Sequence, residues 1–360
     1  MKRALTLASL GVRKTSPNPL VGCVIVKDGE IIGEGWHRKF GEPHAEINAL
    51  TDAHSHGQDV QGATLYVNLE PCSHWGKTPP CATRLVDEGI SEVVTAMRDP
   101  NPEVDGRGID ILRNAGVKVT ELKEFEDEAM FLNRGFIYAQ KYGRPFITVK
   151  AAVSLDGKMC LANGSSKWIT SKLSRIHAHT LRAENDAVVV GVNTVLTDNP
   201  ELTVRHVTGE NPLRVVLDTR LNTPPEAKVI GTDGKCIILS GVKSSSEKEA
   251  MLRDAGAEII RLPYYGSRID LTAAMKPLVQ RGILTLMVEG GSAVISAFMR
   301  ENIADYLKMF IAPRILGEGK GFNLKMNFED VEHSYRLLRQ KTTLLGKDIM
   351  IEGELRCLRD

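Results

Sequence analysis

The feature that most constrains the fold of this chain is an alternation of strand-like and helix-like segments that stops once and then starts again. Runs of β-branched residues alternate with longer amphipathic segments, which is the pattern of layered α/β domains. The interruption is the "GRP" at residues 143–145, which follows a polar helical segment and precedes a new strand-like run. We therefore expect two α/β domains, residues 1–142 and 143–360, and the 360 residues are enough for both.

Turn and cap signals divide each domain further. In the first domain the expected elements are a hairpin over residues 20–37 around the Asp28-Gly29 turn, a helix opened by "PHAEINAL", a strand in 63–69, a helix from about Cys81 to Glu88, a strand in 91–97, a helix over 106–116 closed by Gly116, and one polar helix over 124–142. In the second they are strands in 146–154, 186–192, 213–218, 235–240, 257–262 and 283–291, a helix over 171–185, a helix after Gly291, and a closing hairpin over 335–355 with its turn near Gly346-Lys347.

Composition and charge exclude several classes of function. The chain has 42% hydrophobic and 25% charged residues, as a soluble globular protein does, and its formal net charge of +1 gives no overall field to hold a nucleic acid. No apolar run reaches the length of a membrane span, and the start is too quickly charged for a secretory signal. Six cysteines without such a signal indicate a reducing compartment, so we expect a cytoplasmic protein with free thiols or metal ligands.

The segment "GEPHAEINAL" places His44 and Glu46 two residues apart, just after Pro43. Two side chains at this spacing cannot share a face in the middle of a helix. Both could reach one point if His44 stands at the start of the helix, which the preceding proline favours. The pair indicates one metal ligand and one acid/base group.

The other ligands are expected in "EPCSHWGKTPPC", where Cys72 follows a proline and Cys81 opens a predicted helix. One histidine and two cysteines leave a fourth position open, which is typical of catalytic rather than structural zinc. Zinc at such a site can hold a water and lower its pKa, and Glu46 could then move a proton from that water to a leaving group. His74 is an alternative ligand.

The other histidines and cysteines singled out in the sequence are not expected to bind metal. The "HSH" at residues 54–56 is expected to be a solvated turn rather than a metal pair. The remaining cysteines show no ligand spacing and are expected to be structural: Cys23, Cys160, Cys236 and Cys357.

The His-x-Glu pattern with its two cysteines resembles the zinc-dependent cytidine/deoxycytidylate deaminase superfamily, whose signature continues with Pro-Cys-x-x-Cys. This sequence departs from that signature, because eight residues separate Cys72 from Cys81. The long spacer resembles the riboflavin-biosynthesis branch of the superfamily, as do "NPLVGCVIV" and "RDPNP".

In the second half, "ILTLMVEGGSAVISAFMREN" reads as a buried strand, a turn at Gly290 and Gly291, and an amphipathic helix. Backbone N–H groups at such a helix start bind phosphates well, although similar turns also join strands to helices without any ligand. Because no G-x-G-x-x-G follows a strand, a Rossmann fold is not expected.

The motifs "KAAVSLDGK", "GSSKWIT", "GVNTVLTDNPELTVR" and "VEGGS" resemble the reductase half of the bifunctional riboflavin-biosynthesis deaminase/reductases. The resemblance implies a cytidine-deaminase-like three-layer α/β/α domain followed by a dihydrofolate-reductase-like α/β domain. It also implies one zinc per chain, NADPH, a small phosphoribosylamino-pyrimidine substrate, and no nucleic-acid or membrane partner. The oligomeric state stays open, with a homo-oligomer as one option.

The resemblance further implies specific site residues. In the deaminase half, Glu46 would be catalytic, and substrate contacts would come from Asn18, Lys77 and Asn101. In the reductase half, substrate contacts would come from Lys150, Ser166, Arg182, Leu202, Arg205 and Glu289, while Ala152, Trp168, Thr194, Asp198, Gly291 and Ser292 would border NADPH.

Plainer roles stay open for several of these residues. Either Arg182 or Arg205 could grip a phosphate through its planar fork or form a surface ion pair. Lys77 could be an ordinary exposed lysine, and Trp168 could cap the core.

Taken together, we expect a two-step enzyme that deaminates a diamino-pyrimidinone bearing a phosphoribosylamino group and then reduces the ribose to ribityl with hydride from NADPH. One rival is a nucleic-acid-editing deaminase, which would need a basic groove and stacking aromatics, whereas aromatics are 5% of the chain. Another is a regulatory binding protein built on an inactive deaminase, which would be expected to lack one of the zinc-site residues.

Overall fold

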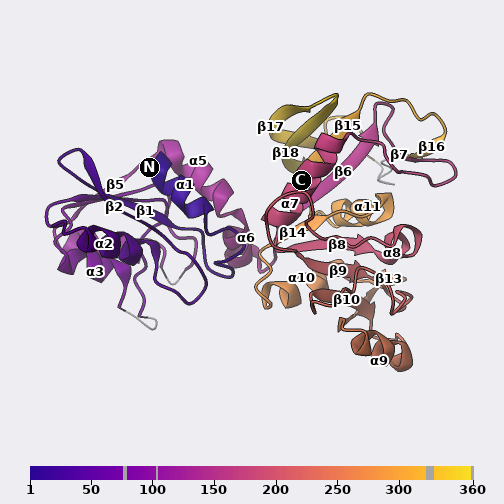
Figure 1. The fold of residues 1–360 in the computed structure, drawn as a ribbon, viewed down its shortest axis with the longest axis horizontal. Helices are drawn as coiled ribbons and strands as arrows, with labels where there is room; N and C mark the ends of the chain where they lie inside the picture. Colours follow the sequence, from indigo (N-terminus) through magenta and orange to yellow (C-terminus); the bar gives the residue numbers. More distant parts are fainter. Residues whose placement is uncertain (76–78, 103, 322–327, 358–360) are drawn as a thin grey trace. The chain divides into compact units, whose positions relative to one another are not determined.

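The chain forms two compact units in a computed structural model, Met1–Arg144 and Pro145–Asp360, each built around its own sheet (Figure 1). The structure describes residues 1–75, 79–102, 104–321 and 328–357. The domain boundary expected after residue 142 lies at the end of a helix, Arg134–Tyr142, and the next strand begins at Phe146. As a boundary between independently folding parts it stays a prediction.

The sheet of the first unit has the order β2-β1-β3-β4-β5. Its strands are β1 (Gly22–Lys27), β2 (Glu30–Trp36), β3 (Thr64–Val67), β4 (Glu92–Thr95) and β5 (Lys118–Glu121). The first two strands form the expected antiparallel hairpin around Asp28 and Gly29, and β3, β4 and β5 run parallel. The predicted hairpin and the strands in 63–69 and 91–97 are confirmed.

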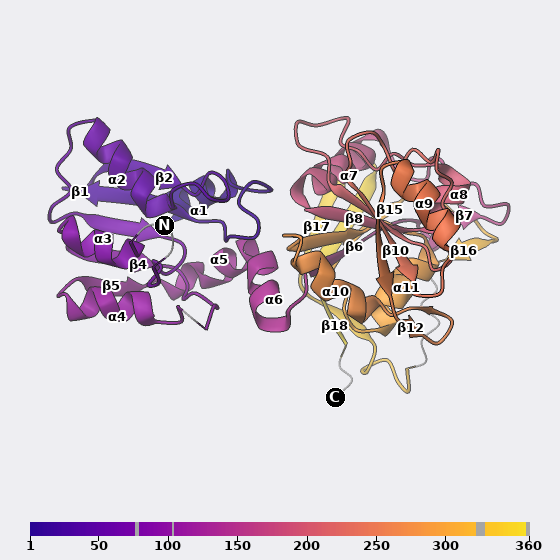
Figure 2. The same ribbon diagram turned by 90° about the horizontal axis from the view of Figure 1, so that it is seen from below.

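Helices cover both faces of this sheet (Figures 1 and 2). They are α1 (Lys2–Ser9), α2 (Ala45–Ser55), α3 (Cys81–Asp87), α4 (Arg107–Asn114), α5 (Glu126–Leu132) and α6 (Arg134–Tyr142). Apolar residues of α2, α3 and α4 form one core with β1, β3 and β4, whereas residues of α1, α5 and α6 pack in separate clusters on the other face. The three-layer α/β/α architecture is therefore confirmed.

The single polar helix expected over residues 124–142 is wrong. A short 3-10 turn leads into α5, and α6 follows after a break at Asn133. The buried Asn133 side chain accepts a hydrogen bond from the Leu20 amide at 2.7 Å and donates one to the Leu20 carbonyl at 3.0 Å. These hydrogen bonds between residues far apart in the sequence explain why the helix is interrupted at Asn133. Helix α1 and strand β5 were not predicted from the sequence.

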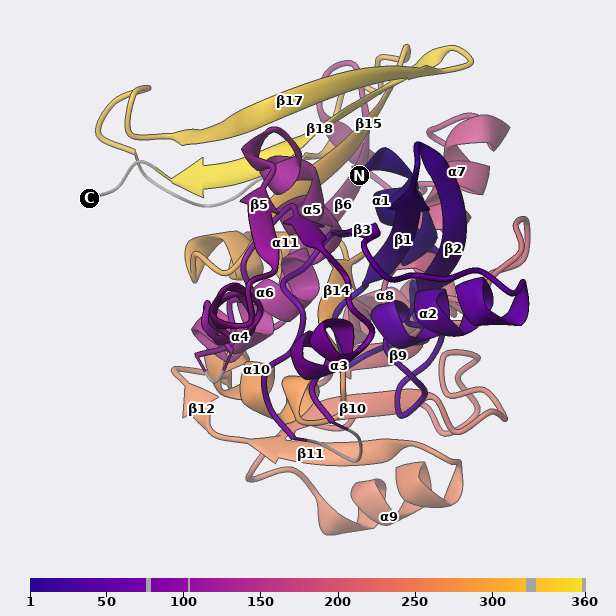
Figure 3. The same ribbon diagram turned by 90° about the vertical axis from the view of Figure 1, so that its left-hand side faces the viewer.

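The second unit is built on a sheet with the order β11-β10-β9-β8-β14-β6-β15-β18-β17. Its strands are β6 (Phe146–Ser154), β8 (Ala187–Gly191), β9 (Leu213–Leu217), β10 (Cys236–Gly241), β11 (Glu258–Leu262), β14 (Thr285–Val288), β15 (Tyr306–Ala312), β17 (Tyr335–Leu345) and β18 (Asp348–Cys357). Each strand from β11, at one edge of the sheet, through β6 to β15 is parallel to its neighbours in this order. Strands β18 and β17 then add an antiparallel pair at the other edge. The closing hairpin with its turn at Gly346 is confirmed and is drawn in yellow beside β15 in Figure 3.

Two pairs of small strands lie outside the main sheet: β7 (Lys158–Leu161) with β16 (Gly319–Gly321), and β12 (Tyr264–Tyr265) with β13 (Arg268–Ile269). Helices again cover both faces: α7 (Lys172–Glu184), α8 (Val192–Asp198) and α9 (Ser246–Asp254) on one, α10 (Leu271–Val279) and α11 (Ser292–Arg300) on the other. The alternating strand–helix order places the carboxyl ends of the parallel strands at one edge, where ligands of open α/β sheets bind.

Across the described residues, no helix is long and apolar enough to cross a membrane.

The packing of α1 on β1 depends on a glycine. A Cβ at Gly22 would lie 2.1 Å from the Ala4 carbonyl oxygen and 2.5 Å from the Ala8 nitrogen, so Gly22→Ala must push the helix off the strand. We expect it to lower the free energy of unfolding by roughly 1–3 kcal/mol, as overpacking does. Thermal unfolding, with the exposed Lys2→Ala in α1 as the control, tests this. An unchanged transition in Gly22→Ala would mean that α1 packs more loosely than described.

Candidate functional site

His44 and Glu46 meet at the start of α2, as their spacing predicts. His44 is the N-cap residue, with extended backbone angles of φ −69° and ψ 166°, and Glu46 lies in the first helical turn. Because His44 stands outside the helix, its ring can turn toward the same point as the Glu46 carboxyl. Glu46 is only 3% exposed.

Both cysteines reach the His44 ring. Its Nδ1 lies 3.6 Å from Cys72 Sγ and 3.4 Å from Cys81 Sγ, and the three ligand atoms lie within 4.8 Å of one another. A tetrahedral zinc with bonds of about 2.3 Å to sulfur and about 2.0 Å to nitrogen separates such atoms by about 3.5–3.8 Å. The donor set and its spacing therefore fit zinc with a fourth position left for water.

The two cysteines are also tied directly to each other. Cys72 Sγ accepts a hydrogen bond from the Cys81 amide at 3.3 Å, and the Cys72 carbonyl accepts one from the Ala82 amide at 3.2 Å. Hydrogen bonds from Cys81 and His44 lower the pKa of the Cys72 thiol to about 4, which favours the thiolate that a metal needs.

Glu46 has the opposite environment. Burial raises its pKa to about 7, despite the opposing charge of His44, and its carboxyl is hydrogen-bonded to the Cys81 side chain. A carboxyl whose pKa lies near neutrality can both take up and release a proton. This is the property expected of the acid/base group beside the metal ligands.

A second buried glutamate, which the sequence analysis did not single out, holds the loop that carries Cys72. Glu70 accepts hydrogen bonds from four backbone amides at 2.9–3.2 Å, those of Asp99, Gly106, Gly108 and Ile109. A Cβ at Gly108 would lie 1.9 Å from the Pro71 carbonyl oxygen, so α4 packs against this loop without space for a side chain. The only sequence signal was the position of Glu70 before the "PC" pair.

Of the three residues expected to contact the substrate in the first unit, the structure describes Asn18 and Asn101. Asn18 donates from its amide to His37 Nε2 at 3.2 Å, and His37 Nδ1 lies 3.1 Å from the Pro43 carbonyl. A carbonyl only accepts, so the proton sits on Nδ1; burial lowers the pKa of this ring, whose edge meets His44 with centroids 5.5 Å apart. His37 was missed by the sequence analysis. Lys77 lies outside the described residues.

The backbone N–H of Asn101 donates a hydrogen bond to Asp99 Oδ1 at 2.8 Å in the loop before α4, and burial raises the pKa of Asp99 to about 6. The roles of Asn18 and Asn101 in substrate binding stay predictions.

The alternative metal ligands are less favoured by position. His74 is exposed and is not among the three clustered ligands. The exposed "HSH" forms the end of α2 rather than a turn in a loop, and His54 pairs with Glu88 at 3.0 Å. Cys23 and Cys236 are buried, as expected of structural thiols, and Cys160 is half-buried.

In the second unit, Glu289 forms ion pairs with two of the basic residues that were predicted to contact the substrate. It directly follows β14 and pairs with Arg182 from α7 at 2.8 Å and with Lys150 from the neighbouring β6 at 3.4 Å. Burial alone would raise the pKa of Glu289, but the charges of Arg182 and Lys150 lower it to about 2. The carboxylate is therefore ionised, and Arg182 forms a buried rather than a surface ion pair.

The segment after α8 lies beside this cluster. Leu202 is buried with φ of 55°, a conformation that non-glycine residues adopt only at a cost of about 1–3 kcal/mol and that is frequent at functional sites. The Thr203 carbonyl accepts a hydrogen bond from Arg182 at 3.0 Å, and the Arg205 amide donates to His179 Nδ1 at 3.2 Å. The Arg205 guanidinium forms an exposed pair with Glu201.

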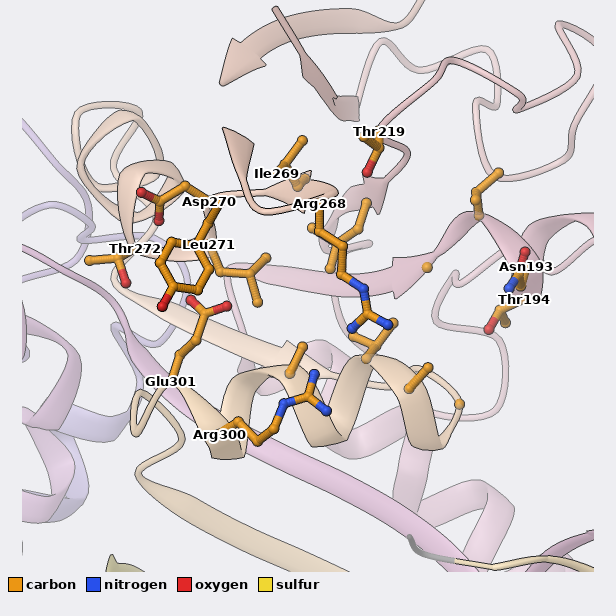
Figure 4. Close-up of a pocket in the computed structure, with 18 residues that line it drawn as sticks. Asn193, Thr194, Thr219, Arg268, Ile269, Asp270, Leu271, Thr272, Arg300 and Glu301 are labelled. Carbon is orange, nitrogen blue, oxygen red and sulfur yellow. The ribbon is translucent and has the colours of Figure 1, made fainter. Parts of the chain in front are cut away.

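Two of the residues predicted to border the cofactor line a cavity, and the others lie outside its lining. A cavity of about 800 Å³ opens where β8 and β9 end, and Thr194 and Gly291 line it (Figure 4). Ser292 is the first residue of α11, beside Gly291, and Asp198 ends α8. Ala152 in β6 and Trp168 lie outside the lining; Trp168 is 62% exposed, so it does not cap the core, and Arg175 stacks on its ring.

Ser166 lies in the loop before Trp168 and is half-buried. The ligand contacts predicted for these residues stay predictions. Thr219, Arg268 and Arg300 also line the cavity but were not predicted from the sequence, because they come from three separate segments with no common motif.

Comparison with known proteins covers both units. Residues 1–97 match the family described as cytidine and deoxycytidylate deaminase zinc-binding region, and residues 145–351 match the RibD C-terminal domain. The riboflavin biosynthesis protein RibD of Aquifex aeolicus is 44% identical over 98% of this chain and 96% of its own length.

Solved structures of related proteins are similar to this chain over nearly its whole length. A diaminohydroxyphosphoribosylaminopyrimidine deaminase/5-amino-6-(5-phosphoribosylamino)uracil reductase from Thermotoga maritima is similar over 99% of this chain and 97% of its own, with 37% identity and a TM-score of 0.86. A RibD structure from Acinetobacter baumannii has the same identity, coverage and TM-score.

The ligand set makes a direct prediction about metal content. Purified protein should hold about one zinc per chain, and Cys81→Ser should lose most of it, because one of the three protein ligands is gone. Atomic absorption measures this, with Cys160→Ser in the other unit as the control. Full zinc content in both Cys72→Ser and Cys81→Ser would contradict the assignment and would make His74 the residue to test.

Proposed function

This chain belongs to the RibD family of bifunctional deaminase/reductases of riboflavin biosynthesis, and we propose that its two units carry out the two successive steps at the sites described above. The first unit would hydrolytically deaminate 2,5-diamino-6-(5-phosphoribosylamino)pyrimidin-4-one. The second would reduce the ribosyl group of the product to ribityl. The meeting of His44, Cys72 and Cys81 at one point, with the buried Glu46 beside them, carries the assignment of the first step.

In the first unit the zinc ligands and the acid/base group have separate roles. Zinc, when bound by His44, Cys72 and Cys81, supplies a Lewis acid that lowers the pKa of a water. Glu46 takes a proton from the attacking water and gives it to the departing amine, so that ammonia leaves and an oxygen replaces it on the ring. Its pKa of about 7 allows it to accept and then donate.

In the second unit the reaction is a hydride transfer. NADPH, when bound, supplies the hydride, and the protein supplies position and charge. The Glu289 carboxylate holds Arg182 and Lys150 together, so two cations stand beside one anion. This excess of positive charge suits a phosphorylated substrate. Among the residues that the structure describes, Lys150 Nζ makes one hydrogen bond, of 3.4 Å to Glu289, so it keeps further donors for a ligand.

The rival functions are less well supported. An inactive deaminase used for regulation would have no need for a buried Glu46 beside a complete ligand set. An editing deaminase would need a nucleic-acid groove, whereas family membership extends over both units. A homo-oligomer and a cytoplasmic location stay predictions.

The first test separates the two activities through Glu46. Glu46→Gln keeps the size of the side chain and removes the base, so zinc should stay bound while ammonia release falls by roughly 10²- to 10⁴-fold. Given the deaminated substrate and NADPH, the same preparation should oxidise NADPH at close to the wild-type rate. Glu42→Gln, an exposed change in the preceding loop, is the matched control.

Near-normal ammonia release in Glu46→Gln would remove this residue from the mechanism. A parallel collapse of NADPH oxidation in folded protein would show that the two sites are coupled.

The second test addresses the domain boundary. The first unit and the second have separate apolar cores, with Ile137 of α6 in the former and Ile147 of β6 in the latter. A fragment that begins near Lys141 should therefore fold and bind NADPH on its own. Circular dichroism and fluorescence titration with NADPH measure this. An insoluble fragment from a stable whole chain would mean that the two halves share a core.

A further inference from the structure

Arg268, which no described residue pairs with, lines the cavity where β8 and β9 end, and we propose that Arg268, assisted by Arg300, binds the phosphate on the 2′-oxygen of the cofactor's adenosine ribose and thereby selects NADPH over NADH. This inference rests on the proposed function, because it takes a nicotinamide dinucleotide as the hydride donor. The residues belong to different elements, Arg268 to β13 and Arg300 to the end of α11.

The lining of the cavity indicates which end of the cofactor it takes. Hydride passes directly from the nicotinamide to the substrate, so the nicotinamide must lie near the substrate residues gathered around Glu289. Neither Glu289 nor its partners Arg182 and Lys150 line the cavity, whereas Thr194 and Gly291, two of the residues expected to border the cofactor, do. The cavity therefore suits the other end of the molecule, the adenosine. Its volume of about 800 Å³ is ample for that group.

Arg268 is available for a ligand. Among the described residues it makes no hydrogen bond or ion pair, and in Figure 4 its side chain extends from β13 into the cavity toward α11. Several other arginines of this unit are held by carboxylates: Arg182, Arg205, Arg214, Arg253, Arg261, Arg281 and Arg339. Arg268 is exposed and its side chain extends into the cavity, so its guanidinium is accessible to a ligand there.

The acidic residues of the lining are already engaged. Asp270 caps α10, where its Oδ1 accepts a hydrogen bond from the Ala273 amide at 3.0 Å. Glu301 interacts with the Arg300 charge and is hydrogen-bonded to Thr272. The charge of Arg300 is therefore partly offset, whereas that of Arg268 is not, and Arg268 is the stronger candidate for the main contact.

The chemistry matches the difference between the two cofactors. NADPH carries a phosphate of nearly two negative charges at the position where NADH has a hydroxyl. Arginine presents a planar fork that binds phosphate oxygens in pairs, and it remains charged at all relevant pH values. Loss of the Arg268 charge should therefore weaken NADPH binding while leaving NADH binding almost unchanged.

The experiment compares ligands that differ only in this phosphate. Calorimetry on the full-length protein measures the Kd of 2′-phosphoadenosine 5′-diphosphoribose and of adenosine 5′-diphosphoribose, and steady-state kinetics gives KM for NADPH and NADH. In Arg268→Gln we expect the affinity for the 2′-phosphorylated ligand to fall about 10-fold or more, as loss of a charged hydrogen bond does, with KM for NADPH rising in parallel. Arg268→Lys should retain part of the affinity.

The matched control is Arg336→Gln, an exposed arginine on β17 that loses the same charge outside the cavity. It should change neither ligand's affinity. A wild-type preference for the 2′-phosphorylated ligand that survives in Arg268→Gln and in the double variant with Arg300→Gln would overturn the inference and leave the proposed function intact. Equal weakening of both ligands would also overturn it, since the contact would then be to a group that they share. A wild-type protein that oxidises neither NADPH nor NADH with the deaminated substrate would instead refute the proposed reductase function.

Discussion

Each unit buries a glutamate just past the carboxyl end of a parallel strand, and the groups that compensate its charge hold the adjoining site in place. A carboxylate removed from water is costly unless donors or cations surround it. Glu70 is matched by four backbone amides from one loop and helix, which fixes the segment leading to Cys72. Glu289 is matched by Arg182 and Lys150, which join α7 to the middle of the second sheet. The same physical requirement thus organises two unrelated sites.

Glu46 is compensated less completely, because the charge of His44 and the hydrogen bond with Cys81 do not outweigh the effect of burial. It is as deeply buried as Glu70, yet it has no such group of amides around it, and its pKa lies near 7. Three glutamates of one chain therefore have three functions, set by their neighbours. One is a structural acceptor, one is an anion that orders cations, and one is a group able to exchange protons.

Local patterns in the sequence were enough for most of the fold and for the metal site. Proline before His44 predicted the start of α2, and the two cysteines completed a recognisable ligand set. Features that depend on partners far away in the chain were not accessible. The break at Asn133 requires Leu20, more than a hundred residues earlier, and no short motif marks it. Arg268 belongs to a two-residue strand whose importance appears only when the end of β9 and α11 are placed around it.

The direct ties between Cys72 and Cys81 also bear on how such enzymes diversify. Cys72 follows the segment held by Glu70, and it accepts hydrogen bonds from the two amides that open α3, so these contacts join the two cysteines directly across the stretch that separates them in sequence. An insertion between the two cysteines can therefore leave these two hydrogen bonds in place. A spacer of eight residues in place of two is therefore compatible with the same set of three metal ligands.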